Sequence, residues 1–177
     1  AFLYCNHTQP LGDVFTPALP CLPGRIYTVV SPANLAIPVI GKLLPYLGAL
    51  PIPHTMQGMK EFSAAIEHRV NQGKYVTFYP EAHVWEYYTG IRPFSHSSFK
   101  YPVKLGKPVY CMTSTYQERA PGKRPRCPVF VDGPFYPDPA LPQREQAIHL
   151  RDRVYACMVR RSQESTCQYI RYAPKTD

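Results

Sequence analysis

Residues 60–81 read K-E-F-S-A-A-I-E-H-R-V-N-Q-G-K-Y-V-T-F-Y-P-E, and this stretch predicts a helix that is followed directly by a strand. Apolar residues recur at helical spacing over residues 60–72, and Gly73 ends the helix. The aromatic and β-branched run over residues 75–79 then predicts a strand that stops at Pro80 and Glu81. A helix that leads straight into an apolar strand is typical of an α/β domain.

Elements on both sides of this stretch continue the alternation of strands and helices. Further strands or short extended pieces are predicted over residues 1–5, 25–31, 49–53, 109–116 and 129–131. A helix interrupted by prolines is predicted from its N-cap Asn34 to Leu47, and a last helix opens at Pro142. We therefore expect an α/β fold in which a single domain, residues 1–177, holds a mixed, largely parallel sheet flanked by helices.

The composition is that of a basic globular protein. The hydrophobic fraction of 45% excludes a disordered chain, and the net charge of +8 favours phosphate-bearing small molecules, acidic lipid surfaces or nucleic acid as partners. The six cysteines show no C-x-x-C spacing, so we expect reduced thiols and neither a disulfide framework nor a zinc site. Lys42 and four prolines interrupt the apolar residues 35–53, which are predicted as buried core or as a surface resting on lipid, and not as a membrane span.

Polar side chains follow two of the predicted strands. His7 and Asp13 belong to the stretch N-H-T-Q-P-L-G-D, residues 6–13, directly after the first strand. A helix would turn the two side chains to different faces, whereas Pro10 and Gly12 favour a bent loop that can bring them together. A carboxylate bonded to one imidazole nitrogen fixes the tautomer and makes the other nitrogen more basic. The plainer alternative is that Asp13 caps a short helix and His7 is an ordinary loop residue.

Glu81 offers a carboxylate at the end of a second apolar strand, either as a functional group or as a helix cap. The working loops of such sheets leave the carboxyl ends of the strands, which fits both His7 and Glu81. Arg92, Lys100 and Lys104 follow among aromatic residues, and this basic stretch is predicted to hold phosphate or to form a solvated face. The histidines lack the spacing of a metal site and the serines lack a G-x-S-x-G motif, so we expect neither a metal centre nor a serine hydrolase.

Four blocks of sequence, taken in order, resemble the glycerolipid acyltransferase family, whose members include the 1-acylglycerol-3-phosphate acyltransferases. The first block, Asn-His followed shortly by Asp, is matched within residues 6–13. The second, an apolar segment with a glycine, resembles residues 47–54, and the third, Phe-Pro-Glu-Gly-Thr-Arg, resembles residues 79–84. The fourth, a Pro-Val strand after a Phe-Lys-x-Gly-like segment, resembles residues 94–108.

The resemblance implies an acyltransferase that moves a fatty acyl group from acyl-CoA or acyl carrier protein to a hydroxyl of a lysophospholipid, first of all 1-acylglycerol-3-phosphate. His7 is implied as the general base and Asp13 as the group that orients it. The apolar residues 35–50 become a candidate wall for the acyl chain. No metal and no cofactor are implied besides the acyl-donor substrate. The implied substrate-binding residues are Glu81, His54, Arg92 and Lys100.

The resemblance also implies a lipid surface as the place of the reaction. We expect the protein at the cytoplasmic face of a membrane, on anionic lipid, held peripherally or by an N-terminal membrane-associating segment missing before Ala1. Nucleic acid is the alternative partner, motivated by the basic pairs at residues 123–124 and 160–161. No nucleic-acid-binding motif accompanies these pairs, so we expect no nucleic acid.

Departures from the family pattern keep a second hypothesis open. Five residues separate His7 from Asp13, where the family has four. Ala82 and Val84 replace the Gly and the Arg of the third block, and His54 ends the second block in place of Arg. The alternative is a catalytically inactive lipid-binding module of the same fold.

Overall fold

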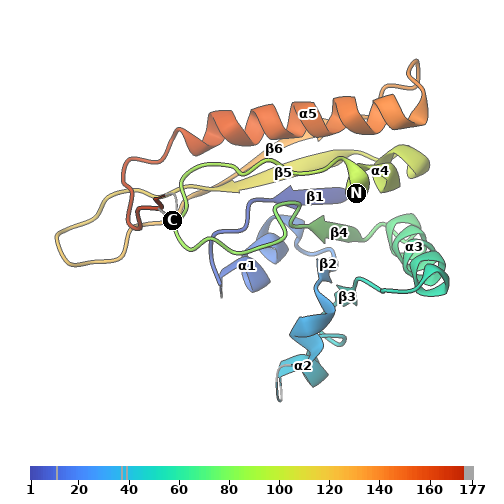
Figure 1. Ribbon diagram of the computed structural model, residues 1–177, viewed down its shortest axis with the longest axis horizontal. Helices are drawn as coiled ribbons and strands as arrows, with labels where there is room; N and C mark the ends of the chain where they lie inside the picture. The colour runs from blue at the N-terminus through green and yellow to red at the C-terminus, as the bar shows by residue number, and fades with distance from the viewer. Residues whose placement is uncertain (11, 37, 39, 174–177) are drawn as a thin grey trace.

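The structure, a computed structural model, describes residues 1–10, 12–36, 38 and 40–173 (Figure 1). Within these residues, six strands form one sheet in the order β3-β2-β4-β1-β5-β6. Strands β1 to β5 are paired in parallel, and β6 runs antiparallel to β5. The strands are β1 (Phe2–Cys5), β2 (Ile26–Val30), β3 (Ala49–Pro51), β4 (Tyr75–Phe78), β5 (Val109–Ser114) and β6 (Val129–Phe135). The expected α/β fold with a mixed, largely parallel sheet is confirmed.

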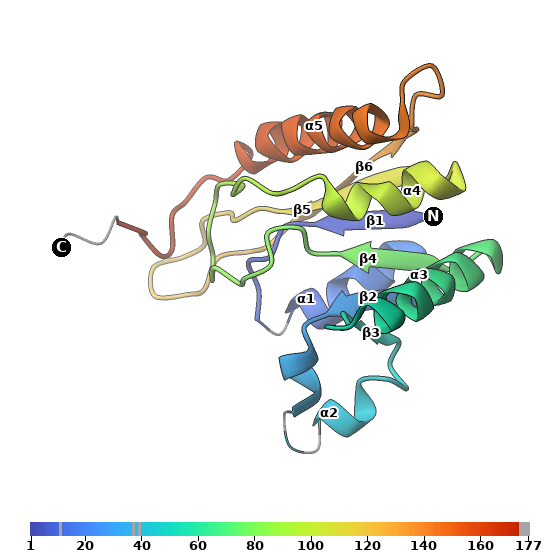
Figure 2. The same ribbon diagram turned by 45° about the vertical axis from the view of Figure 1, so that its right-hand side comes forward.

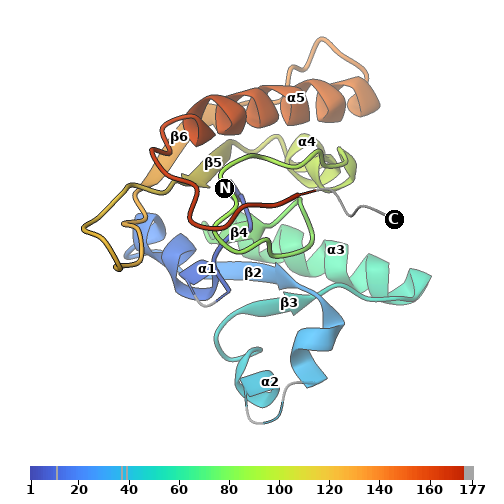
Figure 3. The same cartoon turned by 60° about the vertical axis from the view of Figure 1, so that its left-hand side comes forward.

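Helices cover both faces of this sheet. They are α1 (Gly12–Phe15), α2 (Ile40–Leu43), α3 (Met56–Asn71), α4 (Lys100–Leu105) and α5 (Gln143–Ser162), with the 3-10 helices η1 (Thr16–Cys21), η2 (Pro32–Ala36) and η3 (Ser97–Phe99). Helices α3, α4 and α5 lie on one face (Figure 2), and α1 with η1 lies on the other (Figure 3). No helix among the described residues combines the length and the apolar composition that crossing a membrane requires.

The central strand β1 feeds side chains into a core on each face. Phe2 and Tyr4 are fully buried in the larger core, between the sheet and α3, α4 and α5. Leu3 and Cys5 point the other way and pack beside Cys21 at the end of η1. Successive side chains of a strand point to opposite faces, so a strand with apolar residues at every position must be covered on both sides.

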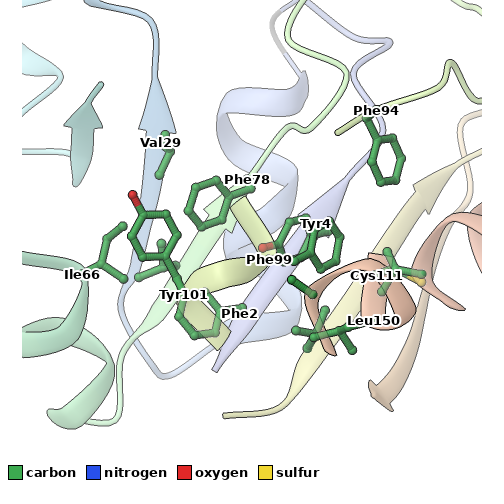
Figure 4. Close-up of a cluster of buried hydrophobic side chains, with 14 of the residues drawn as sticks. Phe2, Tyr4, Val29, Ile66, Phe78, Phe94, Phe99, Tyr101, Cys111 and Leu150 are labelled. Carbon is green, nitrogen blue, oxygen red and sulfur yellow. The ribbon is translucent and has the colours of Figure 1, made fainter. Parts of the chain in front are cut away.

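Aromatic rings dominate the larger core (Figure 4). The ring of Tyr4 stacks on Phe99, with 4.1 Å between ring centroids, and on Phe78 at 5.4 Å. Phe78 in turn stacks on Tyr101 at 5.7 Å. These contacts join β1 and β4 to the start of α4, which fixes the two strands from which the candidate site emerges. Each such pair adds about 0.5–1.5 kcal/mol beyond the burial of the rings.

Two element boundaries differ from the prediction for local reasons. Helix α3 begins at Met56 and not at residue 60, because Thr55 caps it: its Oγ1 accepts a hydrogen bond from the Gly58 N–H at 3.0 Å. Strand β6 extends past residue 131 to Phe135, because it pairs with β5 as far as Val109.

The helix predicted from Asn34 to Leu47 is wrong. The described part of this segment contains the 3-10 helix η2 and the four-residue α2, while residues 37 and 39 lie outside the described residues. A proline inside a helix removes a hydrogen bond and clashes with the preceding turn, so Pro38 and Pro45 leave only short pieces. Helix α4, also short, was not predicted at all.

Candidate active site

The loop after β1 brings His7 and Asp13 together. His7 Nδ1 lies 2.8 Å from Asp13 Oδ2, and the same oxygen accepts a hydrogen bond from the Gln9 N–H at 2.9 Å. Asp13 is placed by the first turn of α1, whose start is closed by a hydrogen bond from the Asp13 N–H to the Gln9 carbonyl at 3.1 Å. With the proton on Nδ1, the imidazole donates to Asp13 and leaves Nε2 free to accept a proton.

The unusual spacing of the pair does not separate its members. Both donors that reach Asp13 Oδ2 come from within the loop, His7 through its ring and Gln9 through its backbone. With five residues between them, His7 and Asp13 still meet, because the ring of His7 and the Gln9 N–H both bond to the Asp13 carboxylate. The hydrogen bond between His7 and Asp13 answers the plainer alternative, in which Asp13 serves only as a helix cap.

The loop is anchored to the sheet by an amide side chain. Asn6 Nδ2 donates to the Ser114 carbonyl at 3.1 Å, and Asn6 Oδ1 accepts from the Ser114 N–H at 2.8 Å. These two bonds join the carboxyl end of β1 to that of β5. Two residues further along both segments, Tyr116 donates its hydroxyl to Thr8 Oγ1 at 2.7 Å. The backbone on both sides of His7 is thus fixed by strand β5 and the residues after it.

Tyr79 supports the pair from the neighbouring strand β4. Its ring stacks on His7 with 4.4 Å between centroids, and its hydroxyl donates to the backbone carbonyl of Asp13. Burial raises the pKa of Tyr79, so the hydroxyl keeps its proton and remains a donor. The Asp13 side chain is 2% exposed and that of His7 is 20% exposed, so solvent or substrate reaches the imidazole while its partner stays enclosed.

Glu81 lies at the carboxyl end of β4, next to β1 in the sheet. Its side chain is buried, and its Oε2 accepts a hydrogen bond from Arg92 Nε at 2.8 Å. The other oxygen, Oε1, is buried without a hydrogen-bond partner among the described residues. Burial raises the pKa of Glu81, while the charges of Arg92 and then His7 lower it in part. The carboxylate therefore lies within the electrostatic reach of the candidate base.

Backbone hydrogen bonds join the two loops directly. The Trp85 N–H donates to the His7 carbonyl at 3.0 Å, and the Tyr87 N–H donates to the Thr8 carbonyl at 3.0 Å. The loop after β4 thus runs beside the loop after β1. Neither Trp85 nor Tyr87 was predicted as part of the site, because no sequence pattern marks a backbone donor.

The structure brings together four of the six predicted residues and separates two. His7, Asp13 and the Glu81–Arg92 pair form one connected site. His54 follows β3 as an exposed residue before α3, at the same edge of the sheet but beyond β2. Lys100 begins α4 and lines a hollow of about 360 Å³ that is shared with the first turn of α5, which does not include His7.

One group of potential metal ligands lies elsewhere. Among the described residues, ligand atoms of Cys111, Asp132 and Cys157 fall within 4.8 Å of one another. Both carboxylate oxygens of Asp132 already accept from Arg161, at 2.8 and 2.9 Å, and Arg160 approaches the Cys157 sulfur at 3.4 Å. Two guanidinium groups therefore occupy the positions at which a cation would bind, and the cluster ties β6 to α5. All six cysteines are free thiols in the structure.

The turn that delivers Glu81 contains a strained residue. Ala82, which stands where the third block has Gly, has a φ of +66°. This left-handed conformation costs a residue with a Cβ about 1–2 kcal/mol, and glycine adopts it freely. Glycine loses about 0.4–1 kcal/mol through the greater freedom of the unfolded chain, so we expect Ala82→Gly to stabilise the protein by up to about 1 kcal/mol. The urea midpoint of unfolding measures this gain.

Ala64 provides the matched control for this substitution. It is an exposed alanine within α3, where glycine costs about 1 kcal/mol. Ala64→Gly should therefore lower the urea midpoint that Ala82→Gly raises. A fall of similar size in both variants would contradict the strain assigned to Ala82.

Comparison with known proteins finds a family and a fold. Residues 1–115 match the model of the family described as Acyltransferase. No curated protein matches the chain. Among solved structures, the chain is similar to the crystal structure of the 1-acyl-sn-glycerophosphate (LPA) acyltransferase PlsC from Thermotoga maritima. The TM-score is 0.61 at 19% identity, over 94% of this chain and 67% of that one, and a similarity at this identity shows the fold.

Proposed function

The chain belongs to the acyltransferase family, and from this premise we propose that it moves an acyl group from a thioester donor to a hydroxyl of a lysophospholipid, first of all 1-acylglycerol-3-phosphate. The observation that carries the proposal is the hydrogen bond of 2.8 Å between His7 and Asp13, beside the loop that holds Glu81. Acyl-CoA and acyl carrier protein are the proposed donors. The fold of an LPA acyltransferase supports the choice of acceptor as the first to test.

In the proposed reaction, His7 moves one proton. Its Nε2 takes the proton of the acceptor hydroxyl as the oxygen attacks the thioester carbonyl, and Asp13 stabilises the imidazolium that forms. An oxygen–carbon bond forms, the carbon–sulfur bond breaks, and the proton passes from His7 to the departing sulfur. A positioned base of this kind contributes about 10²–10⁴ in rate, and the rest must come from orientation of the substrates.

Glu81 is assigned to the acceptor. Its Oε2 is held by Arg92, and its buried Oε1 has no hydrogen-bond partner among the described residues, so we assign Oε1 to the acceptor hydroxyl. A buried acceptor without a partner is costly, so a hydroxyl that fills this position gains more than it would at the surface. Because the acceptor is a lipid and the net charge is +8, we propose that the reaction takes place at an anionic membrane surface.

The proposal is tested with purified protein and a panel of acceptors. Labelled acyl-CoA or acyl carrier protein is offered with 1-acylglycerol-3-phosphate, with a lysophospholipid that carries a larger head group, and with glycerol 3-phosphate. We expect labelled diacyl product from the first acceptor with at least one donor. Binding of lysophospholipid vesicles without turnover of any acceptor would favour the inactive lipid-binding module.

A further inference from the structure

Arg92 makes three contacts within the loop that delivers Glu81. Its Nε donates to Glu81 Oε2 at 2.8 Å, and its terminal nitrogen donates to the His83 carbonyl. Its guanidinium also lies over the ring of Trp85, 4.8 Å from the ring centroid. The side chain is 14% exposed. A guanidinium with three such contacts is fixed within the loop and is not a mobile surface cation.

We propose that Arg92 is a positioning residue, which holds Glu81 beside His7 as an oriented carboxylate, and that the C-terminal tail fixes Arg92 through Trp85. The inference rests on the proposed function and replaces the earlier expectation that Arg92 contacts the substrate phosphate. Because Arg92 occupies one oxygen of Glu81, the other oxygen is left for the acceptor.

The electrostatics explain why the carboxylate needs this partner. Burial raises the pKa of Glu81, and a buried carboxyl without a counter-charge takes up a proton and becomes a hydrogen-bond donor. The charge of Arg92, which follows Glu81 in the same loop, lowers this pKa, and so does the charge of His7 in the loop after β1. Asp13, bonded to His7, is the next charge in the site. Arg92 is thus the permanent charge that lowers the pKa of Glu81 against the effect of burial and favours its ionised form.

The tail after α5 completes the stack. The ring of Tyr172 stacks on Trp85 with 4.8 Å between centroids, on a segment that lies past the residues matched by the family model. The Tyr172 hydroxyl donates to the Glu86 carbonyl at 2.9 Å. Figure 3 shows this tail crossing the loop that follows β4. Trp85 therefore contacts both Tyr172 and Arg92, while its backbone N–H donates to the His7 carbonyl.

The test is the pH dependence of kcat/KM in Arg92→Gln. Without the guanidinium, the pKa of Glu81 rises, so the acidic limb of the profile should move to higher pH. Below both pKa values the loss is about tenfold for each unit of that rise, and it shrinks as the pH increases and Glu81 ionises unaided. Arg92→Lys keeps the charge and should recover part of the shift. A loss of equal size at every pH would overturn the proposal, because it would indicate a structural or substrate-binding role.

A second measurement keeps the proposal testable without turnover. NMR titration of the Glu81 carboxyl should give a higher pKa in Arg92→Gln than in the wild type, whether or not the protein transfers acyl groups. An unchanged pKa would overturn the inference and leave the proposed function standing. Absence of turnover together with the expected NMR shift would refute the proposed function alone.

Matched variants separate this role from general stacking. Arg69 lies over the ring of Tyr27 at 4.6 Å, away from the site, so Arg69→Gln should keep the wild-type pH profile. Tyr172→Ala should move the acidic limb in the same direction as Arg92→Gln but less far, and Tyr172→Phe, which keeps the ring, should move it less still. A wild-type profile in Tyr172→Ala would remove the tail from the proposal.

Discussion

Replacing His7 by alanine is expected to slow acyl transfer by orders of magnitude while the fold remains intact. The His7 side chain is 20% exposed and bonds to a carboxylate that is 2% exposed, and its neutral imidazole has a nitrogen that can accept a proton, which the guanidinium of Arg92 lacks. Loss of the base should lower kcat by about 10²–10⁴, and the contribution of substrate orientation should remain. The measurement is the initial rate of labelled product formation, with thermal unfolding recorded on the same preparation.

His149 supplies the matched control for this result. It is an exposed histidine on α5, so His149→Ala should keep the wild-type rate and stability. The His7 ring stacks on Tyr79, and its removal is expected to cost a modest amount of stability that unfolding curves will show. Wild-type turnover in a folded His7→Ala protein would rule out general-base catalysis at this position.

Much of the fold follows from local pattern. Residues 75–79 and 60–72 carry unambiguous strand and helix periodicity, and the structure places β4 and α3 there. The short pieces α2 and α4 escape such reasoning, because prolines lie beside the first and within the second, and packing against neighbours decides their conformation. Periodicity therefore identifies long elements well and short ones poorly.

The site divides in the same way between local and distant causes. The position of His7 and Glu81 after parallel strands already predicts that they share one edge of the sheet. Closure of the His7 loop depends on the bonds between Asn6 and Ser114, which are 108 residues apart in the chain and leave no local signal. Nothing in the basic stretch from Arg92 to Lys104 distinguishes the residue that bonds Glu81 from those that do not.

The role of Lys100 shows the same limit. Lys100 belongs to the basic stretch that was predicted to hold phosphate, but the chain turns after Arg92 into η3 and α4. Lys100 thereby faces the first turn of α5 and lines a separate hollow. We therefore leave it out of the proposed acceptor site and assign it no part in the reaction.

Asp13→Asn is expected to lower kcat by about 10²–10⁴ and to leave KM nearly unchanged, because the imidazolium loses its counter-charge. The amide oxygen can still accept from His7 and from the Gln9 N–H, because both donors converge on one oxygen of the native carboxylate. The substitution removes only the negative charge of the Asp13 side chain. That charge stabilises the His7 imidazolium once it has formed. The substitution therefore tests charge stabilisation separately from orientation.

Asp132→Asn is the control, since this half-buried carboxylate also holds a cation but lies between β6 and α5. Asp132→Asn should lower the stability and keep the wild-type rate, whereas Asp13→Asn should keep the stability and lower the rate.

A double variant of His7 and Asp13 tests whether the two residues act as one unit. If the Asp13 carboxylate acts only through the imidazole, the double variant should be no slower than His7→Ala alone. Once the imidazole is gone, removing its partner has no further effect on the rate. Additive losses would show instead that Asp13 serves the reaction by a route that does not pass through His7.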